Sequence, residues 1–385
     1  MLGLTHPLWG YFIVVSVVLC AYVPALDNEF TYDDRGLILE DQRVSTGDWQ
    51  AIMGQSYWRD AGDGLYRPLT TASLVLNWAI GKDQPWSYHL VNILLHALAT
   101  VLVVYTVNLF YECHMGIVAG LVFALQPGPS EAVFSIVGRA EILACCLGLG
   151  AIIYGQNAQK KRGLWGWGCV FGCLVCSMMA KENGIAFAAG LLVWEISSAR
   201  RIHTIGAIAL AAIAFAIGAK WWAIGMLTPE GIGYLDNPLA YRTETMRFAH
   251  GFGLFARALV KLIFPWPLVA DYSPLQIPLY SNWWTGEVVW PLIFVVHLVA
   301  CTLILMRNEA KWGLWLGISA GAMLATSNIL VATGTIFAER LLYIPAVGLS
   351  IALAWCWGKM ALFFRRMGLA IWTIIAVGIL WDRAA

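Results

Sequence analysis

Two adjacent carboxylates, Asp33 and Asp34, follow the first apolar stretch of the chain. That stretch runs from about Leu8 to Leu26 and ends at Asp27, so the two acids are tethered at one face of a bilayer. Repulsion between neighbouring carboxylates raises the pKa of such a pair, and partial burial raises it further. One of the two is therefore a candidate general base. The competing interpretation is a solvated turn just beyond a helix end.

The composition indicates a polytopic membrane protein. Hydrophobic residues make up 60% of the chain and charged residues only 12%, which lies outside the range of ordinary soluble domains. The nine cysteines lie in apolar segments or one short turn, so we expect no disulfide framework. Cys169, Cys173 and Cys176 are interpreted as helix-packing residues rather than a metal cluster. The first apolar stretch lacks a basic region before it and is interpreted as an uncleaved span.

The hydrophobic pattern predicts an all-α membrane domain over residues 1–385, with about eleven spans and two large external loops. The loops cover about residues 27–85 and 227–287. The first loop is expected to contain short helices over 49–58 and 69–80. Residues 244–264 carry basic side chains among apolar positions, which favours a helix lying along the membrane surface. The third span breaks at Pro127-Gly128-Pro129, and residues 130–140 are expected to form a loop at membrane depth. The predicted spans are about 8–26, 88–110, 115–126, 141–157, 164–180, 184–197, 204–226, 288–306, 312–331, 341–358 and 368–381.

The short turns on one side of this predicted bundle carry ten basic residues, namely Lys160, Lys161, Arg162, Arg200, Arg201, Arg307, Lys311, Lys359, Arg365 and Arg366. The acids there are only Glu112 and Glu309, with Glu195 at the border, out of 23 Asp and Glu. By the positive-inside rule these turns are cytoplasmic. Both large loops and the carboxyl terminus are then expected outside.

Charged residues at the outer ends of the predicted spans form a candidate site. Charges in tight apolar turns are costly unless they are paired or face a polar cavity. Besides the aspartate pair and Ser130-Glu131, the candidates are Arg67, His89, Arg139, Glu141, Lys181, Glu182, Asp271, Glu339 and Arg340. The competing interpretations are structural ion pairs, Arg139 with Glu141 and Glu339 with Arg340, and a hydrated turn at Lys181-Glu182.

Carboxylates and cations at an outer leaflet suit a lipid-phosphate-linked sugar as substrate. Its polyprenyl chain stays in the bilayer while Arg or Lys binds the phosphate. The phosphate is a good leaving group, so one Asp that deprotonates an acceptor hydroxyl is enough, and the anomeric configuration inverts. The sequence contains neither a nucleotide-binding glycine fingerprint nor a P-loop, which argues against a cytosolic nucleotide-sugar or ATP-driven mechanism.

Seven short motifs in series resemble the membrane domain of the TMTC family, which is related to the protein O-mannosyltransferases of the GT-C superfamily. They are Tyr32-Asp33-Asp34, Tyr66-Arg67-Pro68-Leu69-Thr70, Tyr88-His89-Leu90-Val91-Asn92, Gly138-Arg139-Ala140-Glu141, Lys181-Glu182, Ala270-Asp271-Tyr272-Ser273 and Glu339-Arg340-Leu341-Leu342-Tyr343. The resemblance implies a GT-C fold, a polyprenyl (dolichyl) phosphate mannose donor, and transfer to Ser or Thr hydroxyls of exported proteins.

The resemblance also implies roles for individual residues. It makes Asp33 and Asp34 catalytic, with Asp33 slightly favoured as the base, and assigns donor-phosphate contacts to Arg139, Lys181 and Arg340. It leaves a divalent cation open, because oligosaccharyl relatives use one and mannosyltransferase relatives do not. The sequence departs from the family because no 34-residue helical repeats follow the last span. This departure favours a bacterial inner membrane over the endoplasmic reticulum.

Two other functions compete with transfer to protein hydroxyls. One is transfer of the sugar to a lipid or glycan by an enzyme of the same superfamily. The other is a transporter or flippase for lipid-linked sugars. A transporter needs ionisable residues near the bilayer midplane, whereas nearly all of them here cluster at the outer ends of spans.

Overall fold

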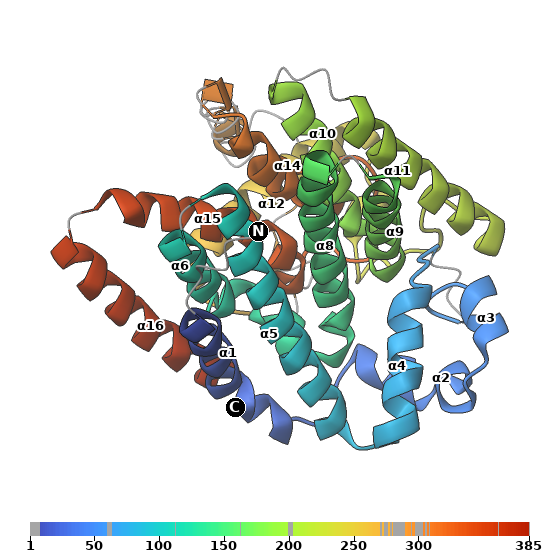
Figure 1. Cartoon of the computed structure of the whole chain (residues 1–385). Coiled ribbons are helices and arrows are strands. Elements are labelled where there is room, and N and C mark those ends of the chain that lie inside the picture. Colours follow the sequence, from blue (N-terminus) through green and yellow to red (C-terminus); the bar gives the residue numbers. More distant parts are fainter. Residues whose placement is uncertain are drawn as a thin grey trace.

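The computed structural model describes residues 8–59, 64–111, 113–161, 163–198, 203–269, 309–360 and 362–384, together with parts of 272–307. Within these ranges the chain is helical and contains no strand (Figure 1). Its elements are α1 (Leu8–Tyr22), η1 (Val23–Asp27), η2 (Arg35–Leu39), α2 (Gln42–Thr46), α3 (Trp49–Gly54), α4 (Pro68–Gly81), α5 (Pro85–Phe110), α6 (Cys113–Ala124), η3 (Gly128–Ser130), α7 (Glu131–Phe134), η4 (Ile136–Gly138), α8 (Arg139–Lys161), α9 (Leu164–Ala180), η5 (Glu182–Gly184), α10 (Ile185–Ser197), α11 (His203–Ile224), η6 (Pro238–Tyr241), α12 (Glu244–Ile263), α14 (Lys311–Thr326), η7 (Glu339–Leu342), α15 (Tyr343–Lys359) and α16 (Leu362–Ala384).

Five helical stretches among the described residues are long and apolar enough to cross a membrane, and a bent pair would make six. The five are Leu8–Asp27, Pro85–Phe110, Ile136–Gln159, Thr204–Ile224 and Glu339–Lys359. Helices α9, α10, α14 and α16 also lie where spans were predicted but do not meet the same length and hydropathy test as single spans. The all-α membrane fold is confirmed, whereas the count of eleven spans stays a prediction. The predicted span 288–306 lies largely outside the described residues.

The first large loop folds into a small helical layer of its own. Helices α2, α3 and α4 lie to one side of the main bundle (Figure 1). The predicted helix at 69–80 is confirmed as α4, which starts at Pro68, where a missing N–H costs nothing. The helix predicted over 49–58 is shorter, because α3 ends at Gly54. Phe30, Leu37, Ile52 and Leu74 form the buried core of this layer.

The third predicted span breaks where the prolines predict it. The helices on either side of Pro127 meet at 64°, as in a broken span or a re-entrant loop. Residues 130–140 are buried except for the half-buried Ser135, but instead of an open loop they form the end of η3, the short helices α7 and η4, and the start of α8. Gly138 permits the tight return, because a Cβ there would lie 2.3 Å from the Ala132 carbonyl oxygen. Within the segment, the N–H groups of Ser130, Ser135 and Gly138 donate to the carbonyls of Pro127, Glu131 and Ser135, as buried backbone requires.

The helix predicted over residues 244–264 is present as α12, and its position along the membrane surface stays a prediction. Ala249, Leu254 and Phe255 are buried on one side, while Val260 and Ile263 are exposed on the other. Its first turn is capped by the Thr243 hydroxyl, which accepts a hydrogen bond from the Met246 N–H at 3.4 Å. Its last turn carries Lys261, which is buried and enters the polar cluster described below.

Candidate active site

The two adjacent aspartates occupy different environments. Asp34 is 1% exposed, and its carboxylate accepts hydrogen bonds from the N–H groups of Val137 at 3.0 Å and Thr31 at 3.3 Å. Burial raises the pKa of Asp34 to about 6, although these hydrogen bonds oppose the shift. The side chain of Asp33 is 41% exposed instead. Tyr32, just before the pair, has φ of 44°, a left-handed backbone that is uncommon outside glycine.

Arg340 faces Asp33 and is held by Glu131. Its guanidinium lies 3.5 Å from the Asp33 carboxylate and 3.0 Å from that of Glu131. The Arg340 backbone N–H also donates to Glu131 at 2.9 Å. Glu131 opens α7 within the bent segment, and Arg340 belongs to η7, so this contact joins parts of the chain 209 residues apart. The Arg340 side chain is 26% exposed, which leaves part of its guanidinium accessible.

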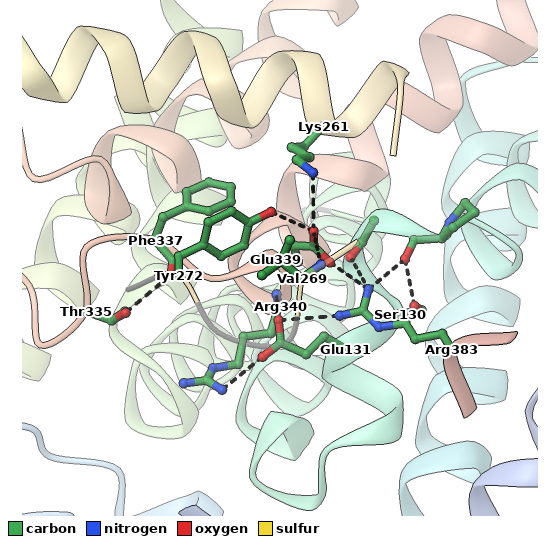
Figure 2. Close-up of polar contacts among 12 residues, drawn as sticks. Ser130, Glu131, Lys261, Val269, Tyr272, Thr335, Phe337, Glu339, Arg340 and Arg383 are labelled. Carbon is green, nitrogen blue, oxygen red and sulfur yellow. Dashed lines mark hydrogen bonds and ion pairs between the residues drawn. The ribbon is translucent and has the colours of Figure 1, made fainter. Parts of the chain in front are cut away.

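Glu339 is the buried anchor of the same cluster (Figure 2). Its carboxylate lies 2.7 Å from Arg383 and 3.7 Å from Lys261, and it accepts hydrogen bonds from the Tyr272 hydroxyl at 2.8 Å and the Val269 N–H at 3.2 Å. Three acids (Asp33, Glu131 and Glu339) and three cations (Lys261, Arg340 and Arg383) therefore form one connected group, which we call the outer cluster after the membrane face predicted for it.

Arg383 links the outer cluster to the last helix. Besides Glu339, it lies 3.9 Å from Glu131 and donates to the carbonyls of Pro127 at 3.3 Å and Gly128 at 3.4 Å. Sequence reasoning missed Arg383 and Lys261 as members of the site, included Tyr272 only as part of a motif, and gave Glu131 no role. A signal existed for Arg383, because it follows the last predicted span on the face where the topology puts the site.

A second group of ion pairs lies beside the first. Lys181 is 2.7 Å from Glu141, which also accepts a hydrogen bond from Asn183 at 2.6 Å. Arg67 is 2.8 Å from Glu182. Burial lowers the pKa of Lys181. The adjacent Glu141 carboxylate opposes this shift, whereas neighbouring cations add to it.

The charges of Arg67 in this group and of Arg340 in the outer cluster both lower the pKa of Lys181 further. The Lys181-Glu182 turn is thus paired rather than simply hydrated. The pairings suggested as alternatives, Arg139 with Glu141 and Glu339 with Arg340, are replaced by Glu141 with Lys181 and Glu339 with Arg383.

Arg139 belongs to neither group and is completely buried. Its guanidinium donates to the side-chain oxygens of Asn92 and Asn77, each at 2.8 Å, and to the Tyr88 carbonyl at 3.0 Å. Its partners are therefore neutral, and its contact with a donor phosphate stays a prediction. His89, 1% exposed, is also buried. Asp271 lies outside the described residues.

A metal site and a separate cavity are the other possible places for chemistry. In the described ranges no three His, Cys, Asp or Glu side chains are grouped as a metal site would need. A cavity of about 450 Å³, lined by Phe110, Tyr111, Lys311 and Lys359 among others, lies at the far end of α5. His89 is 21 residues before Phe110 on that helix, roughly 30 Å away. The outer cluster, with an accessible carboxylate beside a cation, is thus the better candidate for chemistry.

No protein-family model matches the chain. A protein O-mannosyl-transferase of Caenorhabditis elegans is 26% identical over 389 residues, covering 97% of this chain and 55% of the relative. Human protein O-mannosyl-transferase TMTC2 is 32% identical over 297 residues, covering 69% of this chain and 35% of the relative. Mouse TMTC3 is 26% identical and covers 91% of this chain and 42% of the relative. The chain thus spans between about a third and about half of these relatives.

Among solved structures, ArnT from Cupriavidus metallidurans bound to undecaprenyl phosphate has a TM-score of 0.59 at 13% sequence identity. The match covers 94% of this chain and 62% of ArnT. At this identity the likeness shows the fold alone, and it agrees with the GT-C fold that the sequence predicted.

Proposed function

Because the chain is homologous to the TMTC-family protein O-mannosyl-transferases and has a GT-C fold, we propose that it is a glycosyltransferase of the membrane. The proposed donor is a polyprenyl-phosphate hexose, with mannose favoured by the names of the relatives, and the proposed acceptor is a Ser or Thr hydroxyl of an exported protein. A lipid-phosphate donor is further supported by the undecaprenyl phosphate bound to ArnT. The proposed site lies on the non-cytoplasmic face.

One observation supports this function most directly: the accessible Asp33 carboxylate lies 3.5 Å from the Arg340 guanidinium. A base and a phosphate-binding cation must serve the same anomeric carbon from opposite sides, because one bond forms as the bond to phosphate breaks; this contact puts the two groups in one site, and the donor would enter between them. Asp33 would take the proton of the acceptor hydroxyl, and the resulting oxygen would attack the anomeric carbon. The sugar–phosphate bond would break with inversion, leaving polyprenyl phosphate paired with Arg340.

In this proposal Asp34 has a different task from Asp33. Its carboxylate is enclosed and already accepts two backbone N–H groups, so it cannot approach an acceptor hydroxyl without breaking them. It fixes the loop that presents Asp33. Lys181 and Arg139 remain proposed phosphate contacts, but Lys181 is already paired and Arg139 is enclosed, so Arg340 is the contact that the geometry favours.

The test compares Asp33→Asn with Asp34→Asn in liposomes containing a radiolabelled polyprenyl-phosphate mannose and a Ser/Thr acceptor peptide. Asp33→Asn keeps the shape but cannot accept the proton, so turnover should fall by about 10²- to 10⁴-fold while the donor still binds. Asp34→Asn should lose less than about tenfold. Unchanged turnover in Asp33→Asn would place the base elsewhere. Movement of the donor across the bilayer without transfer would instead support a flippase.

A further inference from the structure

The cavity of about 450 Å³ at the far end of α5 has no part in the proposed reaction. Its walls come from the end of α5, the start of α6, the start of α14 and the end of α15. Two lysines, Lys311 and Lys359, line it together with His114 and the aromatic side chains of Tyr111 and Trp355. None of the described residues in its lining is a carboxylate, so its charge is positive.

The cavity lies where apolar helices end. Of the helical stretches that are long and apolar enough to cross a membrane, Pro85–Phe110 ends in its wall and Glu339–Lys359 ends with one of its lysines. The ends of spans of this length lie near the boundary between hydrocarbon and lipid headgroups. Tyrosine and tryptophan, both present in the wall, favour the same boundary. The cavity therefore lies at the depth of the headgroups.

Both lysines are held beside aromatic rings and are still accessible. The Lys311 Nζ lies 4.0 Å from the centre of the Tyr111 ring, and the Lys359 Nζ lies 5.5 Å from the centre of the Trp355 ring. The Trp355 ring packs in turn against Trp312, with 5.6 Å between the ring centres. The Lys311 side chain is 29% exposed, and Lys359 is exposed. A ligand can therefore reach both ammonium groups.

One acid competes for this positive charge. The Glu309 carboxylate lies 3.0 Å from the Lys311 Nζ, but its side chain is 47% exposed. An ion pair this accessible to water contributes little stability, so an anionic ligand can replace it. Glu112, which follows Tyr111 in the sequence, lies outside the described residues.

We propose that this cavity binds the headgroup of an anionic phospholipid, with the lipid phosphate on Lys311 and Lys359. Basic pockets between the ends of membrane helices bind such headgroups, and an ammonium group is a good partner for phosphate. A volume of about 450 Å³ is within the range of small-molecule sites and admits a phosphate together with its glycerol. The acyl chains stay in the bilayer beside the spans. The site is separate from the outer cluster and goes beyond the proposed glycosyl transfer.

The test is a lipid titration of the full chain in an uncharged detergent, read as the rise in the thermal midpoint. Phosphatidylglycerol should raise the midpoint, because a ligand that binds only the folded state stabilises it. Phosphatidylcholine with the same acyl chains should have a much smaller effect. The concentration of phosphatidylglycerol that gives half of the rise should increase by about 5-fold in Lys359→Gln and by about 25-fold in Lys311→Gln/Lys359→Gln, since each lysine contributes separately.

Two further variants control for charge. Lys82→Gln removes an exposed lysine of the first large loop and should titrate like the parent. Glu309→Gln removes the competing acid and should lower the half-concentration by up to about 5-fold. The measurement needs neither sugar donor nor acceptor, so its outcome is independent of whether the protein transfers a sugar.

Three results would overturn the proposal. Equal rises with phosphatidylglycerol and phosphatidylcholine would show that the lipid charge is not recognised. Equal titrations of the parent and Lys311→Gln/Lys359→Gln would put the lipid elsewhere on the protein. A full rise with glycerol phosphate, at the concentrations at which phosphatidylglycerol acts, would make this a site for a soluble phosphate compound instead of a lipid.

Discussion

Arg340 is the residue on which donor binding depends most in the proposed site. In the structure its guanidinium is shared between Glu131 and the more exposed Asp33. The closer contact with Glu131, reinforced by the backbone N–H of Arg340, holds the side chain in place. Its longer contact with Asp33 is the one a phosphate can replace. Binding of the donor would then also release the Asp33 carboxylate for proton transfer.

This view predicts a graded series at position 340. Arg340→Lys keeps the charge but loses the two-pronged fork that matches a phosphate, whereas Arg340→Ala loses both. The KM for polyprenyl-phosphate mannose should therefore rise in the order parent, Arg340→Lys, Arg340→Ala. Steady-state kinetics in liposomes measures the order. Equal KM values in the three proteins would remove Arg340 from the phosphate contact.

A second prediction at the same scale concerns pH. The pKa of Asp34 is about 6 in the folded chain, above its ordinary value of 3.8, so the folded state favours the protonated form. Its contribution to stability is complete below about pH 4 and is lost as pH rises through about 6, a change of about 3 kcal/mol. Relative to the parent, Asp34→Asn should therefore be more stable at pH 7 than at pH 4. Thermal unfolding in detergent measures this, with the exposed Asp83→Asn as control. A constant stability difference between Asp34→Asn and the parent from pH 4 to 7 would contradict the assignment.

The sequence identified many of the site residues but not their partners. Asp33, Glu141, Lys181, Glu339 and Arg340 stand out because charges in apolar turns are conspicuous. Which acid meets which cation depends on contacts between distant segments, such as Glu131 with Arg340, and no local pattern encodes those. That only one of the two aspartates acts as the base was a sequence prediction, with Asp33 slightly favoured. What distinguishes them was hidden, because it depends on the backbone N–H of Val137, which donates to Asp34.

At the scale of elements, the bent segment between α6 and α8 positions the site. It supplies Glu131 to Arg340 through α7, and the Val137 N–H to Asp34 through η4. The prolines at 127 and 129 predicted this break in the helix. The short helices after it could not be foreseen, because each has only three or four residues and is stabilised by burial rather than by a periodic pattern.

Gly138 makes this segment a sensitive point. A Cβ there would come within 3 Å of three main-chain atoms of Ala132, so backbone would have to move. Gly138→Ala should therefore destabilise the protein by roughly 1–3 kcal/mol and reduce turnover by displacing the Asp34 anchor. Gly172→Ala is the control, because Gly172 lies within α9 with open space around it, and it should be neutral or stabilising. Thermal midpoints and turnover of the two variants decide. A Gly138→Ala protein as stable and active as Gly172→Ala would show that the close approach has no cost.

At the scale of the whole molecule, the two ends of the bundle differ in chemistry. The outer cluster and the paired turns Lys181-Glu182 and Glu339-Arg340 occupy one end of helices such as α5 and α15. Lys311 and Lys359 lie at the other end, where they contact the rings of Tyr111 and Trp355. This separation is what the distribution of charge along the sequence predicted, because hydrophobic segments of known length force alternate turns to opposite faces. The number of spans does not follow from the sequence in the same way, because broken and short helices have the same apolar pattern as full spans.

Cysteine labelling tests this arrangement directly. In right-side-out vesicles, single cysteines replacing the exposed Asp83 and Glu230 should react with a membrane-impermeant maleimide, because both belong to the loops placed outside. A cysteine replacing the exposed Glu309 should react only after the membrane is permeabilised, since it lies beside Lys311 in a basic turn. Reactivity of the native cysteines, of which Cys20 and Cys356 are exposed, is measured in the parent and subtracted. Labelling of the Glu309 position from outside would show that the carboxyl-terminal helices have the opposite topology to the one predicted. Protection of the Asp83 position would instead put the first loop, and with it Asp33, on the cytoplasmic face, where the proposed exported acceptor could not reach it.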